Sequence, residues 1–120
     1  MTMTITDYDR IVATIHLYID GFNEHDPKKF KEAFHEDAQL FYIDVDGGLH
    51  VHPLNDEVFE NWGSPENERH IELRIISVAQ MGDVASVALG WDHDYFDFHA
   101  LVRTDGVWKI TNKTASHASR

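Results

Sequence analysis

The stretch YFDFHALVRTDGVWKITNKTASH, residues 95–117, decides the fold of this chain. Two runs of β-favouring residues flank Thr104-Asp105-Gly106, and an Asp-Gly pair supplies the positive φ angles of a tight hairpin turn. Side chains of the first run alternate between two faces. One face carries Phe96, Phe98, Ala100 and Val102, and the other carries Asp97, His99, Leu101 and Arg103. Apolar groups on both faces predict cover on both sides: helices of the same chain on one, and a partner subunit on the other.

Helical spacing dominates the first part of the chain. Apolar residues recur three and four positions apart from Tyr8 to Phe22, which is typical of an amphipathic helix. Asp26-Pro27 predicts the N-cap and first residue of a second, short helix. A third helix is expected over residues 54–62, where apolar residues again follow helical spacing. Strands are expected over residues 38–43, 70–80 and 84–92, followed by the two strands of the hairpin.

Helices that precede a run of antiparallel strands indicate an α+β protein. At 120 residues the chain is expected to form a single domain over residues 1–120 with a core of its own. We predict a curved antiparallel sheet wrapped around the N-terminal helices, which leaves a cone-shaped cavity. The uncovered outer face of the sheet predicts a homodimer.

Composition excludes several classes of function. The net charge of −11, from 21 acidic against 10 basic residues, argues against nucleic acid or an anionic membrane as a partner. The absence of cysteine excludes a disulfide, a thiolate metal site and a cysteine nucleophile. No apolar run is long enough to span a bilayer, and the N-terminus does not resemble a secretory signal, so we expect a cytoplasmic protein.

Three segments carry a resemblance to a known superfamily. They are Tyr18–Phe34 (YIDGFNEHDPKKFKEAF), His35–Ala38 and Thr104–Lys113 (TDGVWKITNK). With the order of the elements, they resemble the nuclear transport factor 2-like superfamily, and within it the SnoaL-like and lumazine-binding groups. The resemblance covers nearly the whole chain and implies a cystatin-like α+β barrel, a cone with a small-molecule cavity. This fold hosts isomerases, dehydratases, cyclases and binding modules, so the resemblance does not select a reaction.

Steroid isomerases of this fold are similar to the chain at two positions. Their oxyanion tyrosine falls on Tyr18, and their protonated aspartate falls near Asp97. Two neutral donors in an apolar pocket would stabilise an enolate. The general base of these isomerases is an aspartate whose position falls on Tyr42, so the resemblance does not extend to their full mechanism.

Scytalone-dehydratase-like proteins share the turn sequence DGVWK of residues 105–109. Of their two histidines, one falls on His70 and the other within a residue of His93. The tyrosine and aspartate of their first helix fall on Phe22 and Asn23, which lack the carboxylate that would orient a histidine base.

Asp97 and His99 form a candidate pair without reference to any family. They lie two positions apart on a strand and so project from the same face. A carboxylate beside an imidazole can orient it and raise its pKa, which suits a general acid or base near neutral pH. We predict His99 as base or acid, Asp97 as its orienter or as a neutral donor, and Tyr18 as donor to an oxyanion. In the alternative, both are solvated rim residues, or Asp97 only forms an ion pair with Arg103 or Lys109.

Aromatic residues with polar tips are candidates for a ligand pocket, because such side chains need a hydrogen-bond partner when buried. They could equally belong to the core. The predicted ligand-binding residues are Tyr42, Trp62, His70, Trp91 and Trp108.

Histidine clusters raise the question of a metal. His50 and His52 share a strand face, and Asp92-His93-Asp94 forms a second cluster. Two ligands without a fixed third are weak evidence for a divalent site, so we predict no metal and no cofactor. The resulting hypothesis is a small-molecule-binding protein that acts as a cofactor-independent enzyme for proton transfer on a small cyclic or aromatic substrate. The alternative is a non-catalytic ligand-binding or dimerisation module.

Overall fold

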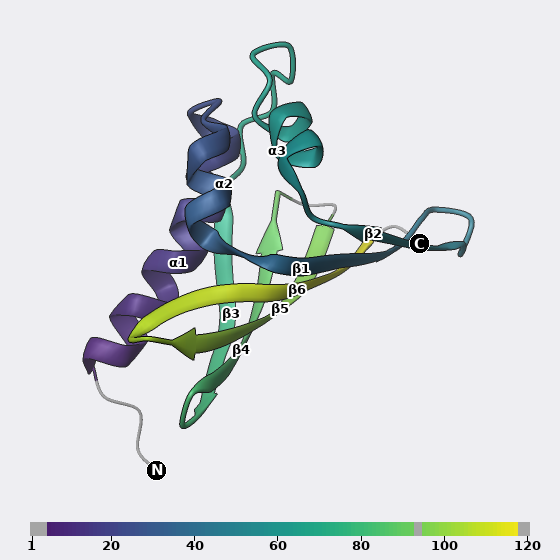
Figure 1. Ribbon diagram of the computed structural model, residues 1–120. Coiled ribbons are helices and arrows are strands. Elements are labelled where there is room, and N and C mark those ends of the chain that lie inside the picture. Colours follow the sequence, from purple (N-terminus) through teal and green to yellow (C-terminus); the bar gives the residue numbers. More distant parts are fainter. Residues whose placement is uncertain (1–4, 93–94, 118–120) are drawn as a thin grey trace.

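The computed structural model describes residues 5–92 and 95–117 (Figure 1). Its helices are α1 (Ile5–Asn23), α2 (Pro27–Ala33) and α3 (Asp56–Trp62). Its strands are β1 (Phe34–Ile43), β2 (Leu49–Pro53), β3 (Leu73–Met81), β4 (Val84–Trp91), β5 (Tyr95–Thr104) and β6 (Val107–His117). None of these helices is both long and apolar enough to cross a membrane.

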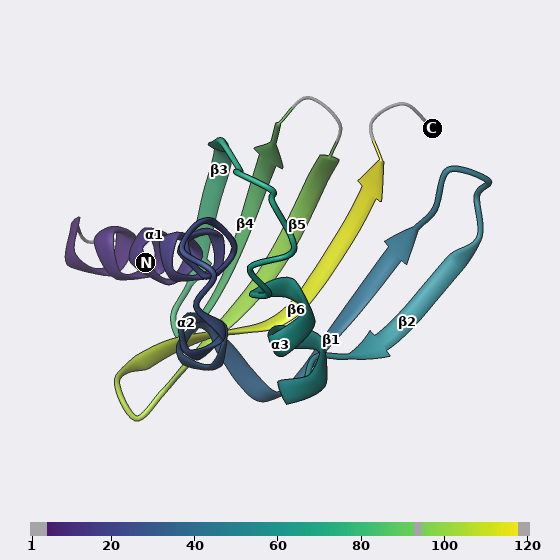
Figure 2. The same cartoon turned by 90° about the horizontal axis from the view of Figure 1, so that it is seen from above.

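The strands form one curved six-stranded sheet in the order β2-β1-β6-β5-β4-β3. The helices lie on one side of it, so the predicted α+β cone is confirmed (Figure 2). One strand pair departs from the antiparallel expectation, because β1 and β6 run parallel. Most of the chain lies between these two strands, so no tight turn forces them into opposite directions.

The C-terminal hairpin forms as its sequence predicts. Thr104 pairs with Val107 across a two-residue loop. The two loop residues, Asp105 and Gly106, have φ angles of 51° and 79°, and both values lie in the left-handed region that this turn requires. The Asp-Gly pair therefore fixes the register of β5 against β6.

The two short helices begin at side-chain caps. The Asp26 carboxylate accepts a hydrogen bond from the backbone N–H of Lys28, and Pro27 opens α2 as predicted. At α3 the Asn55 side chain accepts from Val58 N–H at 3.1 Å, so this helix begins at Asp56, two residues later than expected.

Strand β5 turns its alternate side chains to opposite sides of the sheet. Asp97 and His99 face the interior and are 1% and 0% exposed. Phe96 and Phe98 face outward and are 46% and 63% exposed. The predicted division of the strand into two faces is confirmed, and the structure shows that the polar pair is on the inner one.

Strand β6 changes its alternation part way along. Trp108 and Ile110 are buried, so regular alternation would next turn position 112 inward. The register shifts instead at Thr111, because Leu101 pairs with Ile110 while its neighbour Ala100 already pairs with Asn112. This β-bulge reverses the faces of the residues that follow. As a result Lys113, opposite His99, is buried.

Candidate functional site

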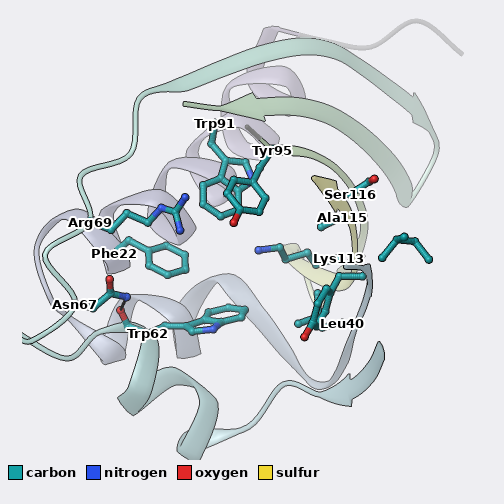
Figure 3. A pocket seen from close by; sticks show the side chains of 12 residues that line it. Phe22, Leu40, Trp62, Asn67, Arg69, Trp91, Tyr95, Lys113, Ala115 and Ser116 are labelled. Atoms are coloured by element: carbon teal, nitrogen blue, oxygen red, sulfur yellow. Dashed lines mark hydrogen bonds between the residues drawn. The ribbon is translucent and has the colours of Figure 1, made fainter. Parts of the chain in front are cut away.

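A cavity of about 220 Å³ lies beside the C-terminal half of β6. Aromatic rings form a large part of its wall, and two cationic side chains, Arg69 and Lys113, reach into it (Figure 3). The aromatic lining residues are Phe22, Tyr42, Trp62, Trp91 and Tyr95. These side chains come from α1, β1, α3 and the adjoining ends of β4 and β5, which the curvature of the sheet brings together.

A buried polar cluster adjoins this cavity, formed by Tyr18 of α1, Asp97 and His99 of β5, and Lys113 of β6. The Lys113 amino group donates to the Tyr18 hydroxyl oxygen at 2.5 Å. The Tyr18 hydroxyl donates to Asp97 Oδ2 at 3.4 Å, and His99 Nε2 lies 3.3 Å from the same oxygen. Lys113 Nζ is 3.6 Å from Asp97 Oδ2. The carboxylate is thus the centre on which the three other groups converge.

Burial and pairing set the protonation of the two charged partners. Burial acts to raise the pKa of Asp97, but the positive charge of Lys113 and the hydrogen bond from His99 oppose it, so the pKa is lowered overall. Burial lowers the pKa of Lys113, and the attraction of Asp97 only partly offsets this effect. Asp97 is therefore ionised at neutral pH, while Lys113 gives up its proton more readily than a surface lysine does.

The two neutral members of the cluster are also shifted. Burial, together with the negative charge of Asp97, raises the pKa of Tyr18 well above its ordinary value, which keeps its hydroxyl protonated. Burial lowers the pKa of His99 in spite of Asp97, so its imidazole is neutral at pH 7. The Nδ1 atom of His99 has no hydrogen-bond partner among the described residues.

Three aromatic rings surround the Lys113 amino group. Its nitrogen lies 5.0 Å from the ring centroids of Tyr18, Trp62 and Trp91. In Figure 3 the Lys113 side chain extends from β6, and its nitrogen atom points toward the middle of the cavity. Ring faces attract a cation, so they partly replace the water that a buried ammonium group loses.

The second cation of the cavity stands over a stacked pair of rings. Trp91 and Tyr95 stack with their centroids 4.3 Å apart, and the Arg69 guanidinium carbon lies 4.3 Å from the Trp91 centroid. Arg69 Nε is 3.6 Å from Asp92 Oδ2. This arrangement holds a positive charge at the wall of the cavity in a protein with a net charge of −11.

The structure brings together the three residues predicted to be catalytic, Tyr18, Asp97 and His99. They lie behind the cavity wall, and Lys113 is the member of the cluster that reaches the cavity lining. Sequence reasoning missed Lys113, because regular alternation from Trp108 places it on the outer face. The signal that could have found it is Asn112, a polar residue at the position where alternation from Trp108 and Ile110 expects an apolar one.

Of the five predicted ligand-binding residues, Tyr42, Trp62 and Trp91 line the cavity. The structure does not bring the other two there. His70 is exposed, in the link between α3 and β3. Trp108 lies at the opposite end of β6, where its ring packs 4.9 Å from the Arg103 guanidinium carbon.

Asn23, at the position of a dehydratase aspartate, has a structural contact. Its amide donates to the Ile71 carbonyl at 3.0 Å and accepts from the Ile71 N–H at 2.7 Å. These two hydrogen bonds tie the link between α3 and β3 to the end of α1.

Within residues 5–92 and 95–117 no group of three or more metal-binding side chains is placed to hold an ion. The His50 ring stacks on Tyr42 with centroids 4.5 Å apart, and its Nε2 lies 2.7 Å from Asp44 Oδ2. This hydrogen bond lowers the pKa of Asp44. His93 and Asp94 of the second predicted cluster lie outside the described residues.

Comparison with known proteins places these features in a wider group. A family model described as "Putative lumazine-binding" matches residues 6–116. The aldolase FrzH of a Cladobotryum species is 27% identical over 117 residues, which covers 92% of this chain and 91% of that protein.

Solved structures agree on the fold. An NTF2-like protein of unknown function from Shewanella baltica superposes with a TM-score of 0.81 at 24% identity, over 98% of both chains. A ketosteroid isomerase-like protein from Erwinia carotovora atroseptica gives a TM-score of 0.75 at 19% identity, over 98% of this chain and 100% of that one.

Proposed function

The chain belongs to this lumazine-binding family of nuclear transport factor 2-like domains, and on that premise we propose that it binds a small cyclic or aromatic carbonyl compound and transfers a proton next to the carbonyl group. The observation that carries the proposal is the amino group of Lys113, which joins a buried hydrogen-bonded cluster to an aromatic cavity. Binding a small molecule fits the fold and the family, and the proton transfer is the specific part of the proposal.

The size and lining of the cavity limit the ligand. Its volume of about 220 Å³ is below the roughly 300–1,000 Å³ of drug-sized sites, which suits a compound of one or two rings. The Trp62, Trp91 and Tyr95 rings offer flat apolar surfaces for stacking. Arg69 and Lys113 favour an electron-rich group such as a carbonyl oxygen or a carboxylate.

The chemistry follows from the lowered pKa of Lys113. The neutral amine removes a proton from the carbon beside the carbonyl: the C–H bond breaks, an N–H bond forms, and the electron pair moves onto the oxygen. The resulting ammonium group is stabilised by Asp97 and by the surrounding rings, and Arg69 lies at the cavity wall to stabilise the oxyanion. The same amine then returns the proton.

An enolate of this kind is the shared intermediate of several reactions. Return of the proton to another carbon gives an isomerisation, loss of a β-hydroxyl group gives a dehydration, and attack on a second carbonyl carbon gives cyclisation or an aldol product. The aldolase relative supports this class of chemistry, although 27% identity does not carry its substrate to this chain.

Tyr18, Asp97 and His99 act in this scheme through Lys113. Tyr18 accepts a hydrogen bond from the amine and donates one to Asp97, so it fixes the direction of the nitrogen lone pair. The charge of Asp97 influences the ratio of neutral amine to ammonium at Lys113. Neutral His99 forms a hydrogen bond with the Asp97 carboxylate. They are positioning residues for the group that touches the ligand.

A non-catalytic module is the second candidate, and one observation favours an association role. Phe96 and Phe98 are exposed on the outer sheet face together with Val84, which is 51% exposed. Large exposed apolar side chains on an uncovered sheet face are typical of an association surface. We include a homodimer through this face in the proposal, and it is compatible with either a catalytic or a purely binding cavity.

Exchange of carbon-bound hydrogen for deuterium tests the proposal. Cyclohexanone, 2-tetralone and an aromatic ketone are incubated with the protein in D2O, and the proton NMR signals beside the carbonyl are followed. For at least one ketone we expect the signal to be lost faster with the protein than in buffer alone. With the Lys113→Met variant we expect the signal to be lost at the same rate as in buffer. Lys109→Met, which alters the other lysine of β6, should match the wild type.

Two further variants address the positioning residues. Asp97→Asn and His99→Gln should slow the exchange and shift its pH profile, while the circular dichroism spectrum stays that of the folded protein. The catalytic proposal is contradicted if no carbonyl compound exchanges faster than in buffer, and the binding module remains if such a compound still raises the thermal midpoint.

A further inference from the structure

The Lys113 nitrogen has the environment of a nucleophile as well as that of a base. It is 5.0 Å from each of three ring centroids, and its side chain is 6% exposed. Its hydrogen-bond partner within the cluster is the Tyr18 hydroxyl, whose proton is already donated to Asp97. The nitrogen therefore reaches the cavity from a fixed position, within a mainly apolar wall.

We propose that Lys113 forms a reversible covalent iminium with the carbonyl carbon of an aldehyde or ketone that enters the aromatic cavity. The inference rests on the proposed function for its ligand class, carbonyl compounds, but it assigns Lys113 a different chemical step. Lysine amines become effective nucleophiles when an apolar pocket removes their water and raises the share of the neutral form.

The step balances without any co-reactant. The neutral Nζ attacks the carbonyl carbon, a C–N bond forms, and the π electron pair moves to the oxygen. That oxygen takes up two protons in all. The C–O bond then breaks, water leaves, and the nitrogen lone pair forms the C=N bond. Counted from the ammonium form, R–NH3⁺ and a ketone give R–NH⁺=CR2 and water, so no proton is needed from outside.

The surroundings of the nitrogen suit the product of this step. The iminium has the same positive charge as the ammonium, at the same atom, so Asp97 at 3.6 Å and the three rings stabilise it in the same way. Tyr18, at hydrogen-bond distance, is placed to pass protons between nitrogen and oxygen. The iminium in turn makes the neighbouring C–H more acidic, because its loss of a proton gives a neutral enamine.

Reductive trapping tests the inference. The folded protein is incubated with cyclohexanone and sodium cyanoborohydride at neutral pH, and the modified lysine is identified by peptide mass mapping. The chain has five lysines, at positions 28, 29, 31, 109 and 113. We expect Lys113 to be modified at least about tenfold faster than Lys28, which lies on the exposed face of α2.

Matched variants separate the chemistry from folding. Lys113→Arg keeps a cation beside Asp97 but cannot form an iminium, so it should fold and lose the adduct. Lys109→Arg should retain the wild-type adduct. Pentane-2,4-dione supplies a second readout, because its enaminone with a lysine absorbs in the near ultraviolet, and the new band should be lost only in Lys113→Arg.

The inference is overturned if the adducts spread over the exposed lysines without preference for Lys113, or if Lys113→Arg keeps the enaminone band. Deuterium exchange that persists in the wild type without a trappable adduct also overturns it. In that case the proton-transfer function stands with Lys113 as a base only, so the two proposals fail separately.

Discussion

The amino nitrogen of Lys113 lies 2.5 Å from the phenolic oxygen of Tyr18, a residue 95 positions earlier in the chain. The contact joins the last strand to the first helix directly behind the wall of the cavity. The same amino group forms a buried ion pair with Asp97. Removing these two charges from water costs free energy, which their mutual attraction and their hydrogen bonds must offset.

Removing one partner of this pair should destabilise the fold. Lys113→Met leaves the Asp97 carboxylate buried without its cation, and we expect the free energy of unfolding at pH 7 to fall by about 3–5 kcal/mol. The double variant Lys113→Met with Asp97→Asn removes both charges and should recover a large part of the loss. Urea denaturation measures all three proteins, and a double variant less stable than Lys113→Met would contradict the pairing.

His99 should make stability depend on mildly acidic pH. Burial lowers the pKa of His99 in the folded state below the ordinary value of 6.5. Just below pH 6.5 the unfolded chain therefore binds a proton at this residue that the folded chain does not bind. The stabilisation is complete above pH 6.5 and is lost as pH falls through the lowered pKa. Denaturation from pH 7.5 to 4.5 should show this slope.

The matched variants for this pH effect are His99→Gln and His16→Gln. The first should flatten the slope, while the second changes an exposed histidine of α1 and should keep it. Equal slopes in the wild type and His99→Gln would show that other groups cause the acid sensitivity.

The outer face of the sheet should hold two copies of the chain together. Phe98 is 63% exposed, and burial of such rings between subunits stabilises association. Sedimentation equilibrium at micromolar concentration should give a dimer, and Phe98→Asp should give a folded monomer. A wild-type monomer under these conditions would contradict the homodimer.

The hairpin turn should require Gly106 because of its backbone conformation, and not because a side chain would lack space. Gly106 has a φ of 79°, and a Cβ at this position would meet no atom within 4 Å. Gly106→Ala should therefore lower the unfolding free energy by about 1–2 kcal/mol through left-handed strain. Gly106→Asn should cost less, because asparagine tolerates this conformation, and equal losses in thermal denaturation would point to another cause.

The fold was accessible from the sequence because its signals are local. The Asp105-Gly106 turn, the Asp26-Pro27 helix start and the spacing of apolar residues in α1 each depend on neighbouring residues, and the structure confirms all three. The parallel pairing of β1 with β6 depends on the path of the whole chain, and no local pattern indicates it.

The candidate site was only partly accessible for the same reason. Asp97 and His99 could be paired because two positions on a strand share a face, and both do face the interior. Lys113 could not be found in this way, because the bulge at Thr111 reverses the alternation of β6. Trp108 and Lys113 therefore both face inward from one strand, on the two sides of this bulge.

The central claim is that the Lys113 amino group meets the carbonyl compound in the cavity. The most direct test is an NMR titration of protein with carbon-13-labelled lysine, which follows the five ε-carbon signals against pH and against added ketone. The account predicts that Lys113 titrates at lower pH than the four other lysines and that a bound ketone shifts its signal selectively. A Lys113 signal that titrates with the surface lysines and does not respond to a ketone that binds would contradict it.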